Sequence, residues 1–391
     1  MKTLRFYNKP LLSTPLSNRL PHCVPKHRAI IHNHRLLHQR NLSKSSFTAH
    51  CSIGKTKPIT STIRNMSVVA TPTDQFFLFS KSGEQVIHNS MTATSHEPAI
   101  HSCFEEKTGT WQYIVADPST NKAIIIDAVL DYDANSRTVS TSTADNLLAI
   151  IFRQGYQVER ILETHAHADH LTAASYLQSR LLQIQGIRPP ICIGKRIHQV
   201  QQLFAAKYGI PTDEYENAFD HLFEDDESFA VGQLTVNVMH LPGHTPDHLG
   251  YQISKNVFCG DSIFHADIGT ARCDFPGGSA KDLYTSAKKL LSLPEDFKIW
   301  TGHDYPACPA RCEAVPWMTV GDHRERNKHV SIDVAEEDFL TLRRKRDAGL
   351  AAPKLLDPSL QVNIRAGRLP RPTPGGERLV SLPIQMLCDA W

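Results

Sequence analysis

The sequence predicts a layered α/β sandwich, in which two β-rich layers are each flanked by helices. Two observations favour this class: short β-rich runs gather in two blocks between residues 97 and 305, and helical stretches lie beside each block. A third is the length of 391 residues with 41% hydrophobic residues, which suits one large α/β domain with extensions. The same composition excludes collagen-like, coiled-coil and disulfide-knot proteins.

The first β-rich block opens with a predicted hairpin. Gln112–Asp117 and Lys122–Ala128 are short runs of β-forming residues, and the turn-forming residues Pro-Ser-Thr-Asn separate them. A helix is expected over Thr143–Gln154, because Ser and Thr residues precede it and Gly155 can end it. A strand is then expected over Val158–Glu163.

The rest of the first half alternates helix and strand. Apolar residues recur at helical spacing over Ala168–Leu182, which predicts a helix directly after the previous strand. Ile191–Ile193 is expected to be a short buried strand, and Ile197–Lys207 a helix.

The second half repeats this organisation. A helix is expected to begin at Ser279, with Asp282 completing a box-like start, and to end near Leu291 before Pro294. Phe297–Thr301 is the last clear strand. Three further runs punctuated by Gly and Pro form the second β-rich block: Gln233–Leu241, Leu249–Ile253 and Val257–Cys259.

The first 73 residues differ in charge from the rest. They hold 12 Lys and Arg residues and no acid, whereas the remainder carries more acidic than basic residues. An acid-free leader rich in Arg and Ser is typical of a mitochondrial transit peptide, and the alternative is a disordered basic arm that binds nucleic acid. We therefore expect a mitochondrial matrix protein, with Met66 as an alternative start for a cytosolic form.

The rest of the sequence limits the kinds of partner that the protein is expected to bind. No run of 18 or more apolar residues occurs, so no membrane span is expected. The acidic body is a poor partner for a phosphate backbone, so no nucleic acid is expected either. Residues 306–391 are expected to be a C-terminal extension that packs on a catalytic domain over 97–305, and the basic run Arg343–Arg346 is expected to be a solvated helix face.

Nine cysteines are scattered without a paired framework. Because no secretory signal precedes them, we expect reduced thiols. Cys308 and Cys312 are four residues apart and resemble half of a zinc clip, but no second Cys or His pair follows at the right spacing. They are therefore expected to be ordinary thiols.

The segment from Glu163 to His170 is dense in metal-ligand types. His165, His167, Asp169 and His170 fall within six residues, directly after one predicted strand and before a predicted helix. Imidazoles and a carboxylate bind Zn, Fe or Mn, and the end of a strand lets several side chains converge on one point. This spacing predicts a metal site.

Further ligand types follow later strands. His244, Asp261 and His303 each come after a predicted strand, and each is preceded by glycine, which relaxes the backbone as the chain turns. Any one of them alone is a weak signal, because an Asp after Gly at a strand end is often part of a turn. The ordered set of all seven is a strong one.

In this order the seven residues resemble the metallo-β-lactamase superfamily over residues 97–305. The resemblance implies an αββα sandwich with metals at one edge of its two sheets. Several segments are also similar to the persulfide dioxygenase branch, and the bacterial β-lactamase hydrolase-like proteins are the most alike. These segments extend the resemblance to about residue 370: Ala166 and Ala168, Pro242–Pro246, Gly269–Phe275, Gly302–Tyr305 and Val362–Gly367.

The resemblance to the persulfide dioxygenase branch implies one Fe(II) per chain, held by His165, His244 and Asp261. Two His and one carboxylate on one face leave three coordination positions open, which suits O₂ beside a sulfur anion. The catalytic residues implied around the metal orient its ligands or hydrogen-bond a bound oxygen. They are His167, Asp169, His170 and His303.

The implied reaction converts glutathione persulfide, O₂ and water to sulfite and glutathione in mitochondrial sulfide disposal. Arg272 is expected to bind a carboxylate of this substrate or to tie its own loop together, and Arg365 is interpreted in the same way. A homodimer is expected.

The main alternative is a di-zinc hydrolase of S-acyl-glutathione that resembles glyoxalase II. The sequence holds every ligand for two metals, so ligand identity alone does not exclude it. Ala166 stands where glyoxalase II has a further histidine, and no counterpart of its glutathione-binding helices is evident. A nuclease of the same fold is a third candidate, which the acidic body disfavours. A scaffold protein that has lost its metal is a fourth, and it would have a broken ligand position, whereas every position is intact.

Overall fold

The computed structural model describes residues 97–384 and Met386, all within the compact unit Phe79–Trp391. The predicted leader, the alternative start at Met66 and three of the nine cysteines (Cys23, Cys51 and Cys388) therefore lie outside the described residues. Among those that are described, no helix is both long and apolar enough to cross a membrane.

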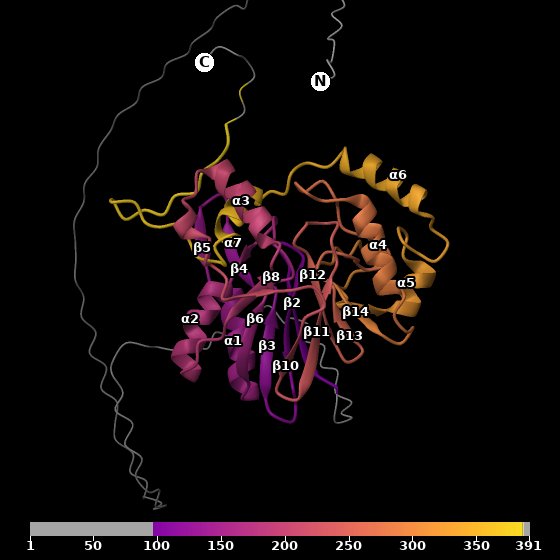
Figure 1. Ribbon diagram of the computed structural model, residues 1–391, viewed down its shortest axis with the longest axis horizontal. Helices are drawn as coiled ribbons and strands as arrows, with labels where there is room; N and C mark the ends of the chain where they lie inside the picture. The colour runs from indigo at the N-terminus through magenta and orange to yellow at the C-terminus, as the bar shows by residue number, and fades with distance from the viewer. Residues whose placement is uncertain (1–96, 385, 387–391) are drawn as a thin grey trace, which may run out of the picture. The chain divides into compact units, whose positions relative to one another are not determined.

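Two six-stranded mixed sheets form the centre of the described part, and helices cover the outer face of each (Figure 1). The fold class predicted from the sequence is confirmed. In sheet order, the first sheet contains β1 (Ala99–Glu105), β2 (Thr110–Ala116), β3 (Lys122–Ile126), β6 (Gln157–Leu162), β8 (Ile191–Gly194) and β9 (His221–Phe223). The second contains β10 (Ser228–Val231), β11 (Leu234–His240), β12 (Leu249–Ile253), β13 (Asn256–Phe258), β14 (Lys298–Trp300) and β15 (Trp317–Thr319).

A small third sheet and the helices complete the fold. The third sheet runs in the order β5 (Thr138–Ser140), β4 (Val129–Asp133) and β7 (Leu171–Thr172). The helices are α1 (Ser142–Gln154), α2 (Ala174–Gln185), α3 (Ile197–Tyr208), α4 (Ala280–Leu291), α5 (Val320–Arg326), α6 (Glu336–Asp347) and α7 (Leu356–Asn363), with a short 3-10 turn at Thr212–Glu214.

The alternation of side chains in β3 explains the layering. Ile124 and Ile126 pack into the cluster between the two large sheets, with Trp111, Tyr251 and Trp300. Ile125 points the other way into the cluster under α1 and α2, since successive side chains of a strand face opposite sides. Because both faces of the strand are covered, its apolar run is unbroken.

Local signals placed several helix ends correctly. Gly155 ends α1 in the left-handed conformation with φ of 68°, which glycine adopts without a Cβ clash. The Ser279 side chain accepts a hydrogen bond from the backbone N–H of Asp282 and begins α4 as predicted. The predicted helix over Ala168–Leu182 was wrong at its start, because α2 begins only at Ala174, after the metal-ligand segment and β7.

The C-terminal part is built into the fold at two places. β15 pairs with β14 and so extends the second sheet. α7 lies against β7. The expected solvated face of Arg343–Arg346 is wrong at its first residue. Arg343 is 2% exposed, because helix α6 turns that side chain toward Thr270 and Asp347 while Arg344 and Lys345 face solvent.

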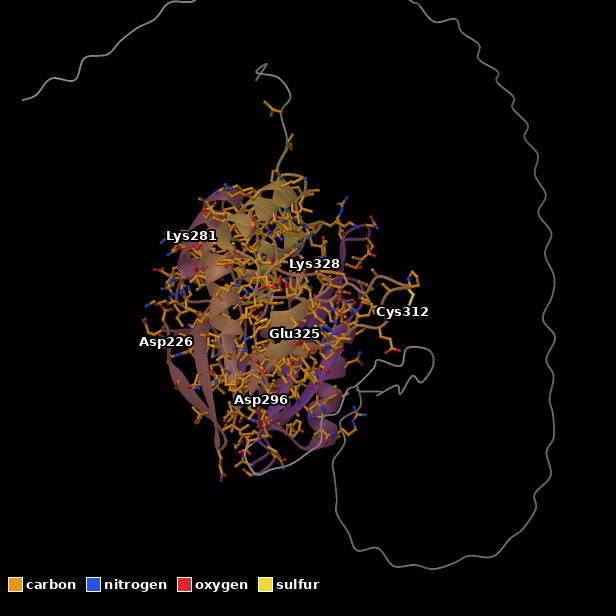
Figure 2. All side chains as sticks on the ribbon, turned by 90° about the vertical axis from the view of Figure 1, so that its right-hand side faces the viewer. Asp226, Lys281, Asp296, Cys312, Glu325 and Lys328 are labelled. Carbon is orange, nitrogen blue, oxygen red and sulfur yellow. A yellow bond between two sulfur atoms is a disulfide. The ribbon has the colours of Figure 1, made fainter. Side chains whose placement is uncertain are left out.

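The expectation that Cys308 and Cys312 are ordinary thiols was wrong. They form a disulfide rather than two ordinary thiols, and Figure 2 shows it beside the Cys312 label. The loop brings their Cα atoms to 4.5 Å, within the range that a disulfide spans. Sequence spacing alone did not reveal this proximity. Four other cysteines are buried and free: Cys103, Cys192, Cys259 and Cys273.

Asp117 joins the β2–β3 turn to the second sheet and yields a pH prediction. Burial raises the pKa of its carboxyl, but hydrogen bonds from Gln233, Thr120 and Ser119 outweigh burial and lower the pKa from 3.8 to about 2. A depressed folded-state pKa stabilises the fold above the unfolded pKa, and this contribution is lost as the pH falls through the folded value. We expect Asp117→Asn to unfold more easily than the parent above pH 4, with the difference vanishing near pH 2.

Urea unfolding followed at a series of pH values measures this difference. A gap between the two proteins that stayed constant down to pH 2 would show that the charge of Asp117 contributes nothing.

Candidate metal centre

The predicted ligands come together where strands of both sheets end. β13 and β14 are parallel neighbours, so their carboxyl ends meet at one edge of the second sheet, where Asp261 and His303 follow. His165 follows β6 in the first sheet, and His244 follows β11 in the second. The loops after four strands therefore supply one site.

Three of the residues are placed to hold one ion. Ligand atoms of His165, His244 and Asp261 all lie within 4.8 Å of one another, and all three residues are buried. The Asp261 Oδ2 is 4.0 Å from Nε2 of His165 and 3.7 Å from Nε2 of His244. His165 Nε2 and Asp261 Oδ1 find no hydrogen-bond partner among the described residues. Buried polar atoms left without partners are costly, and a metal ion at their common focus would satisfy them.

Hydrogen bonds on the far side of each imidazole orient its Nε2 toward that focus. His244 Nδ1 is 2.7 Å from the carbonyl oxygen of Arg272, so Nδ1 carries the hydrogen and Nε2 keeps its lone pair. The Thr164 hydroxyl donates to Asp127 Oδ2 at 2.8 Å, which leaves its oxygen to accept from His165 Nδ1 at 2.9 Å. Both imidazoles are thus held in the tautomer that a metal needs.

His167 is placed differently from the other two imidazoles. Its Nε2 is 3.2 Å from Asp127 Oδ1 and 3.2 Å from Glu163 Oε2, and all three side chains are buried. Burial lowers the pKa of His167, but these two carboxylates outweigh burial and hold the pKa well above its usual value. This nitrogen is occupied, whereas Nδ1 of His167 is buried without a hydrogen-bond partner among the described residues, and His167 groups with Asp169 and His170 as a possible holder of an ion.

Asp169, His170 and His303 gather next to the first three ligands. His303 Nε2 is 3.2 Å from Asp169 Oδ2 and 3.4 Å from Asp261 Oδ2, so it links the two groups. His170 Nε2 has no hydrogen-bond partner within the described part of the chain. Asp169 has a side chain that is 28% exposed, against 8% for Asp261, so this side of the site faces solvent.

Three residues of the site were missed as functional residues in the sequence. Asp127 and Glu163 engage His167, and Asn363 of α7 donates from Nδ2 to the carbonyls of His167 and His170 at 2.8 Å each. The strand-end position of Asp127 was an available signal, because it follows β3 as the other ligands follow their strands. Asn363 lies within a segment that carried the resemblance, but nothing local indicated its contacts.

The two predicted substrate-binding arginines are engaged by the protein itself. Arg272 forms a double hydrogen bond with Asp274, and its Nη1 donates to the carbonyl of Ala351, which matches the role of tying the loop together. Arg365 is buried and pairs with Glu214 at 2.8 Å. Contact of either arginine with a substrate stays a prediction.

Comparison with known proteins places this geometry in a family. The family model described as the Metallo-beta-lactamase superfamily matches residues 107–303, half of the chain. The chain belongs to this superfamily. It is 44% identical over 300 residues to Glyoxylase B2 of Dictyostelium discoideum, covering 75% of this chain and 99% of that protein. The superfamily and the His and Asp donors together indicate a metal site.

Other relatives differ in their sequence identity to this chain and in the share of each protein that the alignment covers. The chain is 41% identical over 291 residues to a beta-lactamase hydrolase-like protein of Xylella fastidiosa, covering 74% of this chain but only 65% of that protein. It is 26% identical over 271 residues to the mitochondrial persulfide dioxygenase ETHE1 of Homo sapiens, covering 68% and 88%. The crystal structure of ETHE1 from Myxococcus xanthus superposes with a TM-score of 0.55 at 24% identity, covering 69% and 99%, which supports the fold.

Proposed function

We propose that the protein is a mononuclear Fe(II) persulfide dioxygenase that oxidises glutathione persulfide. The observation that carries the proposal is the cluster of His165, His244 and Asp261, whose ligand atoms all lie within 4.8 Å of one another. His167 is not part of this cluster, and its Nε2 contacts Asp127 and Glu163 instead. Two His and one carboxylate with open positions is the ligand set of non-haem iron oxygenases. The similarity to persulfide dioxygenases supports the choice of a sulfur substrate.

The open face of the site matches the demands of this reaction. Bound Fe(II) would supply open positions on which O₂ and a sulfur anion meet. Sulfite takes three oxygens, two from O₂ and one from water, while the second sulfur leaves as the thiol of glutathione and two protons are released. The solvent-facing side at Asp169 is where the persulfide would enter.

His303 would supply a proton at Nε2. Its Nδ1 is 3.2 Å from the carbonyl of Gly109, and its Nε2 faces the carboxylates of Asp169 and Asp261. Burial lowers the pKa of His303, but these two carboxylates outweigh burial and raise it. An Nε2–H in this position can be donated to an oxygen of the substrate.

The composition of the leader supports a proposal for the compartment. An acid-free N-terminal stretch is typical of a mitochondrial transit peptide, and the related persulfide dioxygenases are mitochondrial by name. We propose the mitochondrial matrix as the site of action.

The deciding experiment is oxygen uptake by the full chain, loaded with Fe(II) without air, on addition of glutathione persulfide. We expect oxygen consumption to match sulfite formation one to one. Protein that holds two zinc ions, consumes no oxygen and cleaves S-lactoylglutathione would overturn the proposal.

A di-zinc hydrolase of S-acyl-glutathione is the second candidate. It is favoured by the group Asp169, His170 and His303, which lies next to the first ligands and could hold a second ion. The similarity to Glyoxylase B2 points in the same direction. In this candidate a second metal would take the place of the proton on His303 Nε2.

Asp169→Ala separates the two candidates. In the mononuclear enzyme this residue holds no metal, so we expect the variant to bind one Fe(II) per chain with nearly the parent affinity. A dinuclear enzyme would fall from two bound metals to one. Metal analysis of the parent and the variant after loading with Fe(II) or Zn(II), followed by gel filtration, gives the stoichiometry.

A further inference from the structure

The backbone segment Thr270–Cys273 lies between the metal centre and helix α6. The carbonyl of Arg272 in this segment accepts the hydrogen bond from His244 Nδ1 at 2.7 Å. An outer hydrogen bond of this kind sets the orientation of a metal-binding imidazole. The position of this short segment therefore decides where Nε2 of His244 points.

Two charged side chains of α6 hold both ends of the segment. Arg343 Nη1 donates to the carbonyl of Thr270 at 3.3 Å. Asp347 Oδ2 accepts from the backbone N–H of Cys273 at 3.0 Å. The two side chains also pair with each other one helical turn apart, with exposed side-chain fractions of 2% and 11%.

His329 also holds the start of the segment. His329 Nδ1 lies 3.0 Å from the backbone nitrogen of Thr270, which donates to it. A Cβ on Gly269 would come within 2.2 Å of the same imidazole, so the ring packs directly against the backbone there. The segment is thus held by His329 and by the two charged residues of α6.

Stability alone does not explain a buried ion pair at this place. Removing two charges from water costs free energy, and well-packed apolar residues of similar volume are often as stable. Arg343 and Asp347 provide what apolar residues lack, namely a donor for the Thr270 carbonyl and an acceptor for the Cys273 N–H. Their chemistry matches the backbone groups that flank Arg272.

We infer that Arg343 and Asp347 are positioning residues of the metal centre. They hold Thr270–Cys273 so that the carbonyl of Arg272 turns Nε2 of His244 toward the metal. The inference rests on His244 as a metal ligand, as in the proposed function, and it holds whichever reaction the site performs. It gives the C-terminal part of the chain a role in metal binding that acts through the Arg272 carbonyl and His244.

The test measures the affinity of the full chain for Co(II), a probe whose visible absorption reports ligand geometry. We expect Arg343→Met and Asp347→Ala to raise the Kd for Co(II) by about 10-fold, the low end of the effect of losing an outer partner of a ligand, because the Arg272 carbonyl is displaced rather than removed. Their absorption bands should also differ from those of the parent. Arg344→Met is the matched control, because Arg344 is exposed on the same helix.

Asp347→Asn adds a conservative comparison. Its amide oxygen can still accept from the Cys273 N–H, so this variant should bind Co(II) more tightly than Asp347→Ala. If Arg343→Met does not fold, the two Asp347 variants decide the question by themselves.

One pattern would overturn the inference. In it, the variants unfold at lower urea concentrations than Arg344→Met, yet in the folded state they bind Co(II) with the same Kd and the same spectrum. That result would confine the pair to folding. Absence of oxygen uptake by the iron-loaded parent would overturn the proposed dioxygenase and leave the Co(II) comparison intact.

Discussion

Asp261→Ala will abolish metal binding and activity together. The variant loses one of three protein ligands and leaves Nε2 of His165 and of His244 without the carboxylate that faces both. Loss of an outer-shell partner already costs about 10- to 100-fold in metal affinity, so loss of a ligand should cost more than about 100-fold. Dialysis against a buffered Fe(II) solution without air, followed by metal analysis, measures the occupancy.

His165→Ala should behave in the same way, because it removes another of the three ligands. Asp296→Ala is the matched control for the loss of a carboxylate. Asp296 is an exposed residue paired with Lys255, and Figure 2 labels it. Full iron occupancy in either ligand variant would contradict the assignment of these three residues.

Asp127→Asn is expected to have the second largest effect, and it acts on two properties. Asp127 is buried, with φ of 53°, a conformation that asparagine also tolerates, so the change removes charge without backbone strain. It leaves the imidazole of His167 with Glu163 as its one remaining carboxylate partner. Breaking a buried charge pair on one side costs about 3 to 5 kcal/mol, and we expect about 3 kcal/mol because Glu163 remains.

The second effect of Asp127→Asn concerns the tautomer of His165. With an amide NH₂ facing its oxygen, the Thr164 hydroxyl can no longer donate to residue 127 and turns its hydrogen toward His165 Nδ1. The hydrogen of that imidazole then moves to Nε2, the atom that binds the metal. We expect metal affinity to fall by about 10- to 100-fold.

Urea unfolding of the metal-free protein and metal titration of the folded protein separate these two effects. Asp296→Asn is the control, and its exposed ion pair should contribute no more than about 1 kcal/mol. A variant that lost stability but kept the parent metal affinity would show that Asp127 does not set the tautomer of His165.

Much of the candidate site was predictable because its signals are local. A ligand type that follows a β-rich run lies at a strand end, and strand ends of a layered sheet converge, so a metal site built from the seven His and Asp residues was predicted without contacts. The choice of His165, His244 and Asp261 among them came from the family resemblance. Helix boundaries followed from single residues such as Gly155 and Ser279. The helix predicted from Ala168 began too early because apolar spacing does not distinguish a buried loop from a helical turn.

The sequence by itself determined the fold class, the ligand types and their order along the chain, because periodicity and strand-end chemistry are encoded in neighbouring residues. Only the tertiary structure decided how the imidazoles are partnered. Asp127 reaches His167 across 40 positions of sequence, and Asn363 reaches it across 196. The burial of Arg343 also depends on α6 lying against the loop that holds Arg272. Such contacts join elements far apart in the chain, so no local pattern carries them.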